Sequence, residues 1–179
     1  DPDYHYQGIL DAMKTAASKM PRVDAIGVSS AGVYIDNRIM AASLFLKVNE
    51  EDFDKKVKNM YLDVAKEIGA DIPIEVANDG DVTALAGAMD LNDDSVLGIA
   101  MGTSEAVGYI NLNGGINGWL SELAFAPVDF NEGAMQDEWS GDFGVGCKYF
   151  SQDAVIKLAE AGGYKFAEGL TPAQKLKEI

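Results

Sequence analysis

Three short segments of this sequence combine residue types that can take part in chemistry. The first is Asn78-Asp79, which follows the apolar stretch 73–77 and is itself followed by Gly80. In α/β folds, ligands bind in the crevice at the carboxyl ends of strands, and a carboxylate placed there can accept a proton from a substrate hydroxyl group. The alternative is that Asn-Asp-Gly forms only a turn and a helix cap.

The second segment is Gly102-Thr103-Ser104, which separates two apolar stretches. Backbone N–H groups in a tight turn of this kind can bind phosphate oxygens, although an ordinary β-hairpin turn explains the same residues. The third segment contains Glu122, whose carboxylate could accept hydrogen bonds from sugar hydroxyl groups or could simply be exposed. A lone cysteine, Cys147, is by default a buried and inert thiol.

Periodicity and turn signals indicate the elements that must position these residues in the first half of the chain. Asn49 is a suitable N-cap for a long helix that ends at Gly69, and Asp36-Asn37 is a turn signal between two short strands. The predicted elements are a helix over 7–20, strands over 23–29, 33–35 and 38–42, a helix over 53–68, a strand over 73–77 and a helix over 81–89.

The second half of the chain contains two predicted strands, 95–101 and 105–112, joined by residues 102–104. The many Gly, Asn and Asp residues over 118–146 indicate a loop-rich region. Ser151 is expected to cap a helix that runs to Ala161, and Thr171 to Gln174 forms a capping box with proline at the first helical position.

Composition limits the classes of partner. The formal net charge is −15, which disfavours nucleic acid and anionic membranes because both require clustered Lys and Arg. No apolar stretch reaches the roughly 18 residues that span a bilayer. The single cysteine excludes an internal disulfide and agrees with a reducing cytoplasm.

The mixed order of strands and helices predicts an α/β fold. The most natural domain boundary lies in the helix after Asp79, near Gly87. We therefore expect a first partial domain over 1–87 and a second over 88–179.

The order of these segments resembles the ROK family of sugar kinases and sugar-responsive repressors, which are proteins of the actin/hexokinase type. The resemblance covers roughly residues 23–162 and consists of five blocks in the same order. The blocks are Ile26 to Gly32, Val76 to Asp79 with the Ala-rich helix Thr83 to Gly87, Val96 to Thr103, Ser121 to Phe125, and Gly146-Cys147 with Ser151 to Ile156.

The resemblance implies ribonuclease H-like domains with mixed sheets and, for the parent protein, an ATP-dependent sugar kinase activity. In that role Asp79 would be the catalytic base, Asn78 and Glu122 would orient the sugar, and Gly102 and Thr103 would lie near the phosphates of ATP and Mg²⁺. It further implies a small-molecule sugar as partner, a cytoplasmic location and a homodimer.

Several positions depart from the family pattern. The family's zinc ligands, one His and three Cys, fall on Phe125, Ser140, Asp142 and Cys147, of which only Cys147 is retained, so we expect no structural zinc. Glu105 adds a carboxylate next to the predicted phosphate turn, where it would oppose a polyphosphate unless a cation intervenes or the side chain points away.

Two alternatives therefore remain open beside the kinase. One is a non-catalytic sugar-binding or regulatory module of the same fold, favoured by the altered phosphate turn and by Tyr149, which occupies the place of a sugar-binding Glu. The other is an α/β interaction domain without a ligand. The family's Asp-x-Gly-x-Thr loop and its adenosine-binding segment are absent, so we expect the chain alone to lack kinase activity.

Overall fold

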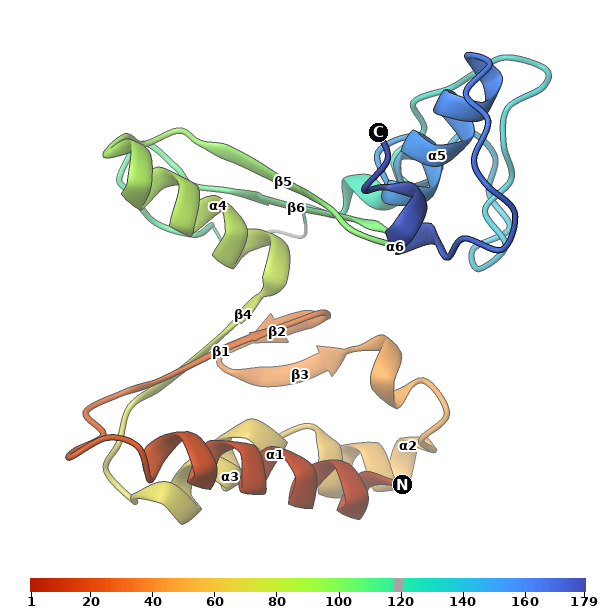
Figure 1. Cartoon of the computed structure of the whole chain (residues 1–179). Coiled ribbons are helices and arrows are strands. Elements are labelled where there is room, and N and C mark those ends of the chain that lie inside the picture. The colour runs from red at the N-terminus through yellow and green to blue at the C-terminus, as the bar shows by residue number, and fades with distance from the viewer. Residues whose placement is uncertain (118–120) are drawn as a thin grey trace. The chain divides into compact units, whose positions relative to one another are not determined.

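The computed structural model describes residues 1–117 and 121–179, which separate into two compact units. The described part of the first unit is residues 1–82, and that of the second is 83–117 and 121–179. Each unit mixes helices with small sheets, so the predicted α/β class is confirmed (Figure 1). The predicted domain boundary, Gly87, lies inside helix α4 (Asp79–Leu91).

The first unit is built on a parallel pair of strands, β1 (Ile26–Ser30) and β4 (Ile74–Asn78). Their register pairs Ile26 with Ile74 at one end and Ser30 with Asn78 at the other. Parallel pairing brings the carboxyl ends of both strands to the same edge, which is where the predicted residues Asn78 and Asp79 lie.

A hairpin, β2 (Val33–Ile35) and β3 (Arg38–Ala41), follows β1 as the sequence predicts. Its turn residues Asp36 and Asn37 both have positive φ, 49° and 62°, which is typical of two-residue hairpin turns. The Asn37 amide also donates to the carbonyl oxygen of Ile74 (3.0 Å) and accepts from the N–H of Val76 (2.7 Å). The turn therefore attaches the hairpin to β4.

The predicted helix over 53–68 is not continuous. Asn49 caps a single turn, α2 (Glu50–Asp52), as expected, but a π-helical turn, η2 (Phe53–Val57), follows it before α3 (Met60–Ile68) begins. The N–H of Lys58 bonds to the carbonyl oxygen of Phe53, five residues earlier. This extra residue rotates the following turn, so Val57 and Met60 both face the core.

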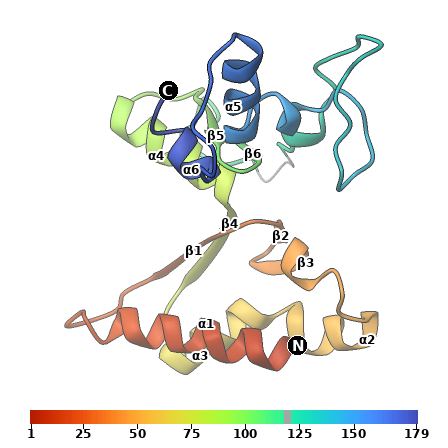
Figure 2. The same ribbon diagram turned by 45° about the vertical axis from the view of Figure 1, so that its right-hand side comes forward.

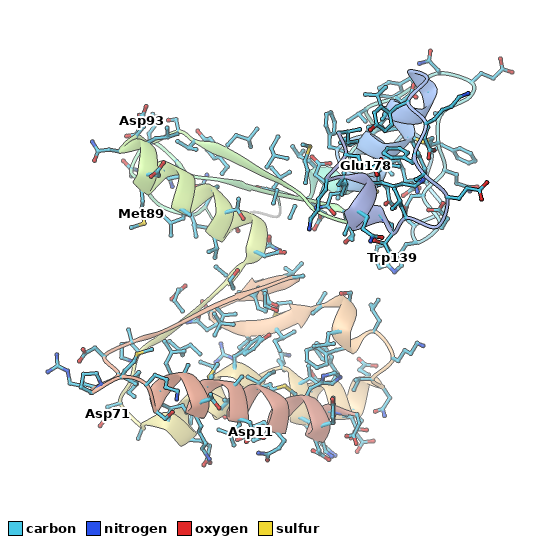
Figure 3. All side chains as sticks on the ribbon, in the orientation of Figure 1. Asp11, Asp71, Met89, Asp93, Trp139 and Glu178 are labelled. Atoms are coloured by element: carbon cyan, nitrogen blue, oxygen red, sulfur yellow. The ribbon has the colours of Figure 1, made fainter. Side chains whose placement is uncertain are left out.

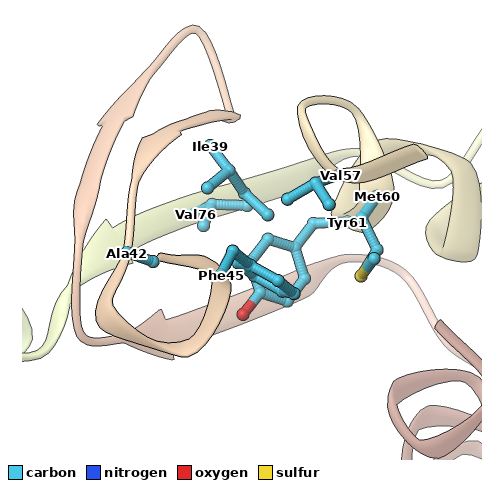
Figure 4. Close-up of a cluster of buried hydrophobic side chains, with 7 residues drawn as sticks. All are labelled: Ile39, Ala42, Phe45, Val57, Met60, Tyr61 and Val76. Carbon is cyan, nitrogen blue, oxygen red and sulfur yellow. The ribbon is translucent and has the colours of Figure 1, made fainter. Parts of the chain in front are cut away.

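The core of the first unit lies between β4, the hairpin and the 53–68 segment (Figure 4). Ile39 and Val57 are fully buried, and Phe45 of the short 3₁₀ turn η1 (Ser43–Phe45) is 2% exposed. The seven buried members of this cluster are Ile39, Ala42, Phe45, Val57, Met60, Tyr61 and Val76.

Helix α1 (Pro2–Ala17) packs alongside α3, and both lie on one side of β1 and β4 (Figures 1 and 2). The helix begins five residues earlier than the predicted 7–20 segment because Asp1 accepts a hydrogen bond from the N–H of Asp3 and Pro2 occupies the first turn. It ends at Ala17, before Met20.

The second unit contains α4 and the antiparallel hairpin of β5 (Leu97–Met101) and β6 (Glu105–Tyr109). Ala84 and Ala88 of α4 pack with Ile110 just beyond β6. The hairpin approaches α4 so closely that a Cβ atom at Gly98 would lie 2.5 Å from Cα of Ala84. Glycine is required at this position for the two elements to meet.

The residues from 121 to 150 are rich in loops, as predicted for this region. Residues 118–120, which belong to the predicted loop, lie outside the described residues. Short 3₁₀ turns occur at η3 (Leu123–Phe125) and η4 (Gly146–Lys148). Ser151 caps α5 (Gln152–Ala161), and the Thr171–Gln174 capping box opens α6 (Pro172–Lys175), both as predicted. Within the described residues, no helix combines the length and apolarity needed to cross a bilayer.

Candidate functional site

Asn78 and Asp79 lie where strand β4 ends and helix α4 begins. The Asn78 side-chain amide donates to the carbonyl oxygen of Gly32 (2.9 Å), and its oxygen accepts from the N–H of Gly80 (2.8 Å). Asn78 therefore connects the end of β4 both to the turn after β1 and to the first turn of α4. Asp79 is partly exposed at the first residue of α4, where the helix dipole favours a negative charge.

Two tyrosines from other elements lie at the same strand ends. Tyr34 of β2 donates to the carbonyl oxygen of Ala31 (3.0 Å), and Tyr61 of α3 donates to the hydroxyl oxygen of Ser30 (3.0 Å). The centroids of the two rings are 6.2 Å apart. The edge of the parallel pair is thus surrounded by hydroxyl, amide, carboxylate and aromatic groups.

Tyr34 also responds to the charge of Asp79. Burial is the main reason why the pKa of Tyr34 rises to about 12, and the negative charge of Asp79 raises this pKa further. The two side chains therefore lie within electrostatic reach. We refer to Ser30, Gly32, Tyr34, Tyr61, Asn78 and Asp79 as the strand-end cluster.

No sequence pattern predicts the two tyrosines of this cluster. Tyr34 belongs to a short strand and Tyr61 to the apolar face of a helix, which are ordinary structural positions. They join Asp79 only because β1 and β4 pair in parallel and the elements after each strand meet at one edge.

The predicted phosphate turn belongs to the second unit and connects β5 to β6. The N–H of Gly102 donates to the carbonyl oxygen of Ser104 (2.9 Å), so this donor is used within the turn. The carbonyl oxygen of Gly102 accepts from the N–H of Gln152 (2.8 Å), which holds the turn against the start of α5. Thr103 is exposed at the tip of the turn.

Glu105, which the sequence places beside this turn, is buried next to Gly146. Its side chain is only 6% exposed, and one carboxylate oxygen lies in the space that a Cβ atom at Gly146 would occupy. Burial raises the pKa of Glu105, and the nearby charge of Glu122 raises it further. The structure thus brings the predicted residue Glu122 close to Glu105.

Two of the positions at which the family resemblance implies zinc ligands, Ser140 and Cys147, donate instead to the carboxylate of Asp137. This carboxylate accepts from the N–H groups of Trp139 (3.2 Å) and Ser140 (2.7 Å) and from the thiol of Cys147 (3.6 Å). The ring of Phe125 packs 5.3 Å from that of Trp139, which Figure 3 labels. The donor set around Asp137 does not fit zinc, because Phe125 cannot ligate a metal and Ser140 is a poor ligand.

The chemistry of these side chains follows from their hydrogen bonds. The backbone N–H of Ser140 is the main reason why the pKa of Asp137 is lowered. Burial raises the pKa of the Cys147 thiol, and the charge of Asp137 raises it further, so the thiol stays protonated and unreactive. Among the residues that the structure describes, no three His, Cys, Asp or Glu side chains form a metal-binding group.

The structure thus describes the predicted site residues in two groups. Asn78 and Asp79 belong to the strand-end cluster of the first unit, whereas Gly102, Thr103 and Glu122 belong to the second unit. The roles assigned to these five residues stay predictions.

Comparisons with known proteins were made by sequence and by structure. No protein-family model matches the chain, and no curated protein matches it. Among solved structures, the chain is similar to one described as "the ROK family transcriptional regulator, homolog of E.coli MLC protein". The TM-score is 0.61 at 18% sequence identity, and the match covers 92% of this chain but 41% of the regulator. The chain therefore has the fold of the corresponding part of a ROK family regulator.

Proposed function

We propose that this chain is the sugar-binding part of a ROK-like regulatory protein, and that a neutral sugar binds at the strand-end cluster. The observation that carries the proposal is the junction of Asn78-Asp79 with Tyr34 and Tyr61 at the carboxyl ends of two parallel strands. Sugars offer many hydroxyl groups and apolar C–H faces. A carboxylate, amides, hydroxyls and aromatic rings are the groups that recognise such a ligand.

The distribution of charge favours an uncharged sugar over a phosphorylated one. No Lys, Arg or His occurs between Lys66 and Lys148, whereas this stretch contains 15 Asp and Glu residues. A sugar phosphate at this cluster would meet Asp79 without a basic side chain from the same stretch to offset the repulsion.

The fold likeness to a ROK family regulator supports the regulatory form of the proposal. The proposal also assigns both units to ribonuclease H-like domains. The chain itself, with a net charge of −15, is unsuited to contact DNA, so its role in such a protein would be to sense the ligand.

A sugar kinase is the second candidate, and the position of Asp79 favours it. A carboxylate at the first residue of α4, directly after a parallel strand, is suitably placed to accept a proton from a sugar hydroxyl group. In that case ATP and Mg²⁺ would bind near Gly102 and Thr103. The N–H of Gly102 already donates to the carbonyl oxygen of Ser104, so it is one donor fewer for a phosphate group. This favours the non-catalytic regulatory protein over the kinase.

Isothermal titration calorimetry tests the proposal. We expect neutral hexoses or N-acetylhexosamines to bind the chain and their 6-phosphates to bind at least about tenfold more weakly, a difference of about 1.4 kcal/mol. Asp79→Asn should weaken binding of the neutral sugar by about tenfold or more, since a hydrogen bond to a charged group contributes about 1.5–3 kcal/mol. Asp71→Asn, at an exposed aspartate of the same unit (Figure 3), is the matched control.

Two outcomes would contradict the proposal. One is the absence of binding by any neutral sugar, and the other is tighter binding of the phosphorylated sugars. Sugar-dependent release of ADP from ATP and Mg²⁺, abolished by Asp79→Asn, would instead support the kinase.

A further inference from the structure

A carboxyl group is buried at the start of strand β6, and one of its oxygen atoms has no hydrogen-bond partner. Glu105 pairs with Met101 across the hairpin, so both side chains lie on the same face of the two strands. Met101 is 52% exposed, whereas Glu105 is 6% exposed. The difference arises because η3 packs against β6, and η4 packs against η3.

The space that Glu105 occupies is created by a glycine. A Cβ atom at Gly146 would lie 2.4 Å from Oε2 of Glu105 and 2.4 Å from the carbonyl oxygen of Leu123. Both contacts are far shorter than van der Waals distance. The Glu105 carboxyl group therefore fits between the backbones of η3 and η4 only because residue 146 has no side chain.

One oxygen of this carboxyl group is unsatisfied. Among the described residues, Oε2 of Glu105 is the one buried side-chain oxygen or nitrogen atom without a hydrogen-bond partner. An ionised carboxylate that is buried without a partner is strongly disfavoured, whereas a protonated carboxyl group is much less so. The surroundings of Glu105 thus favour its neutral form.

The charged group that acts on Glu105 is Glu122, which directly precedes η3. The other titratable groups on the packed elements are Tyr109 of β6 and Cys147 and Lys148 of η4. The Lys148 amine pairs with Glu138 instead (2.6 Å). Because burial penalises a charged group, the buried Glu105 rather than the exposed Glu122 is the member of this pair whose ionisation is disfavoured.

We propose that Glu105 makes the packing of η3 and η4 sensitive to pH. Its neutral carboxyl group holds these two turns together, and its ionisation would place a negative charge beside the Glu122 carboxyl group and loosen them. This proposal does not depend on the proposed function.

The coupling is tested first, without a ligand, by ¹³C NMR of the glutamate side-chain carboxyl carbons in the chain. We expect Glu105 to titrate above the ordinary value of 4.5, and Glu122→Gln to move its midpoint down because a neighbouring carboxylate is removed. Glu132→Gln, at an exposed glutamate of the same unit, should leave the midpoint unchanged. An ordinary midpoint for Glu105, or one that does not respond to Glu122→Gln, overturns the proposal.

Stability against pH gives a second readout. A raised pKa in the folded state means that the contribution of Glu105 to stability is complete below its ordinary pKa and is lost as the pH rises through the raised value. Glu105→Gln imitates the neutral form at every pH. It should match the parent chain in melting temperature near pH 4 and exceed it near pH 8, whereas a lower melting temperature at both pH values would contradict the proposal.

Discussion

The side-chain amide of Asn78 donates a hydrogen bond to the carbonyl oxygen of Gly32 over 2.9 Å, which ties the end of strand β4 to the turn that follows β1. Its amide oxygen accepts from the N–H of Gly80, within the first turn of α4. One side chain thus fixes the two turns that surround Asp79. The strand-end cluster depends on this connection for its shape, whatever ligand it binds.

We therefore predict that Asn78→Ala destabilises the first unit by about 1–3 kcal/mol, because a partly buried backbone donor and acceptor both lose their partner. Denaturant unfolding measures this change. Gln7→Ala removes an amide from the exposed surface of α1 and should stay within about 0.5 kcal/mol of the parent chain. Equal effects of the two substitutions would show that the Gly32 bond contributes little.

The Tyr34 phenol is expected to ionise only at unusually high pH. Burial is the main reason why its pKa rises to about 12, with smaller contributions from Tyr61 and then from the charge of Asp79, so its phenol should remain protonated at pH 11, where an exposed tyrosine is largely ionised. Asp79→Asn removes the negative charge and should lower this pKa, whereas Asp71→Asn should not. The ¹³C chemical shift of the Tyr34 ring carbon that bears the hydroxyl group follows the titration. An ordinary pKa near 10 would contradict the burial of Tyr34, and a pKa that Asp79→Asn leaves unchanged would contradict its proximity to Asp79.

Two glycines of the second unit should respond in opposite directions to the same substitution. Gly98→Ala forces a Cβ atom to within 2.5 Å of Ala84 and should destabilise the unit by about 1–3 kcal/mol. Gly87→Ala lies within α4 with its nearest neighbour, Val96, at 3.9 Å, and should stabilise the helix by up to about 1 kcal/mol. Thermal unfolding of both variants measures the difference. A stabilised Gly98→Ala variant would show that β5 does not approach α4 as described.

The ionised carboxylate of Asp137 should stabilise its loop by accepting hydrogen bonds from two backbone N–H groups. Asp137→Asn places an amide against two backbone donors and should cost about 2–3 kcal/mol at neutral pH. Because hydrogen bonding lowers the folded-state pKa, this contribution is present above the ordinary value of 3.8 and is lost as the pH falls through the lowered value. Urea unfolding at pH 7 and pH 3 should therefore show a larger difference between parent and variant at pH 7 than at pH 3. Asp142→Asn, an exposed neighbour, is the control.

Chelators should not change the stability of the same loop. Phe125 and Ser140 stand where the family resemblance implies zinc ligands, and Asp137 already satisfies the backbone donors there. We expect EDTA to leave the melting temperature unchanged and mass spectrometry to find no zinc in the purified chain. Zinc at one equivalent, lost together with stability on chelation, would contradict this prediction.

The local features of this fold could be predicted from the sequence alone. The Asp36-Asn37 turn, the Asn49 and Ser151 caps and the Thr171 capping box all occur as predicted. The physical reason is that each depends on contacts among residues only two to four positions apart. The position of Asp79 directly after a strand was also predictable, because an apolar stretch followed by polar turn residues marks a strand end.

What only the tertiary structure decided involves residues far apart in the chain. The π-helical turn at Phe53–Val57 and the proximity of Tyr34 to Asp79 have no local signature. The burial of Glu105 is the clearest example, since a glutamate after a turn is normally exposed. It is buried here because Gly146, more than forty residues later, leaves room for its carboxyl group, and spacing along the sequence carries no information about such a contact.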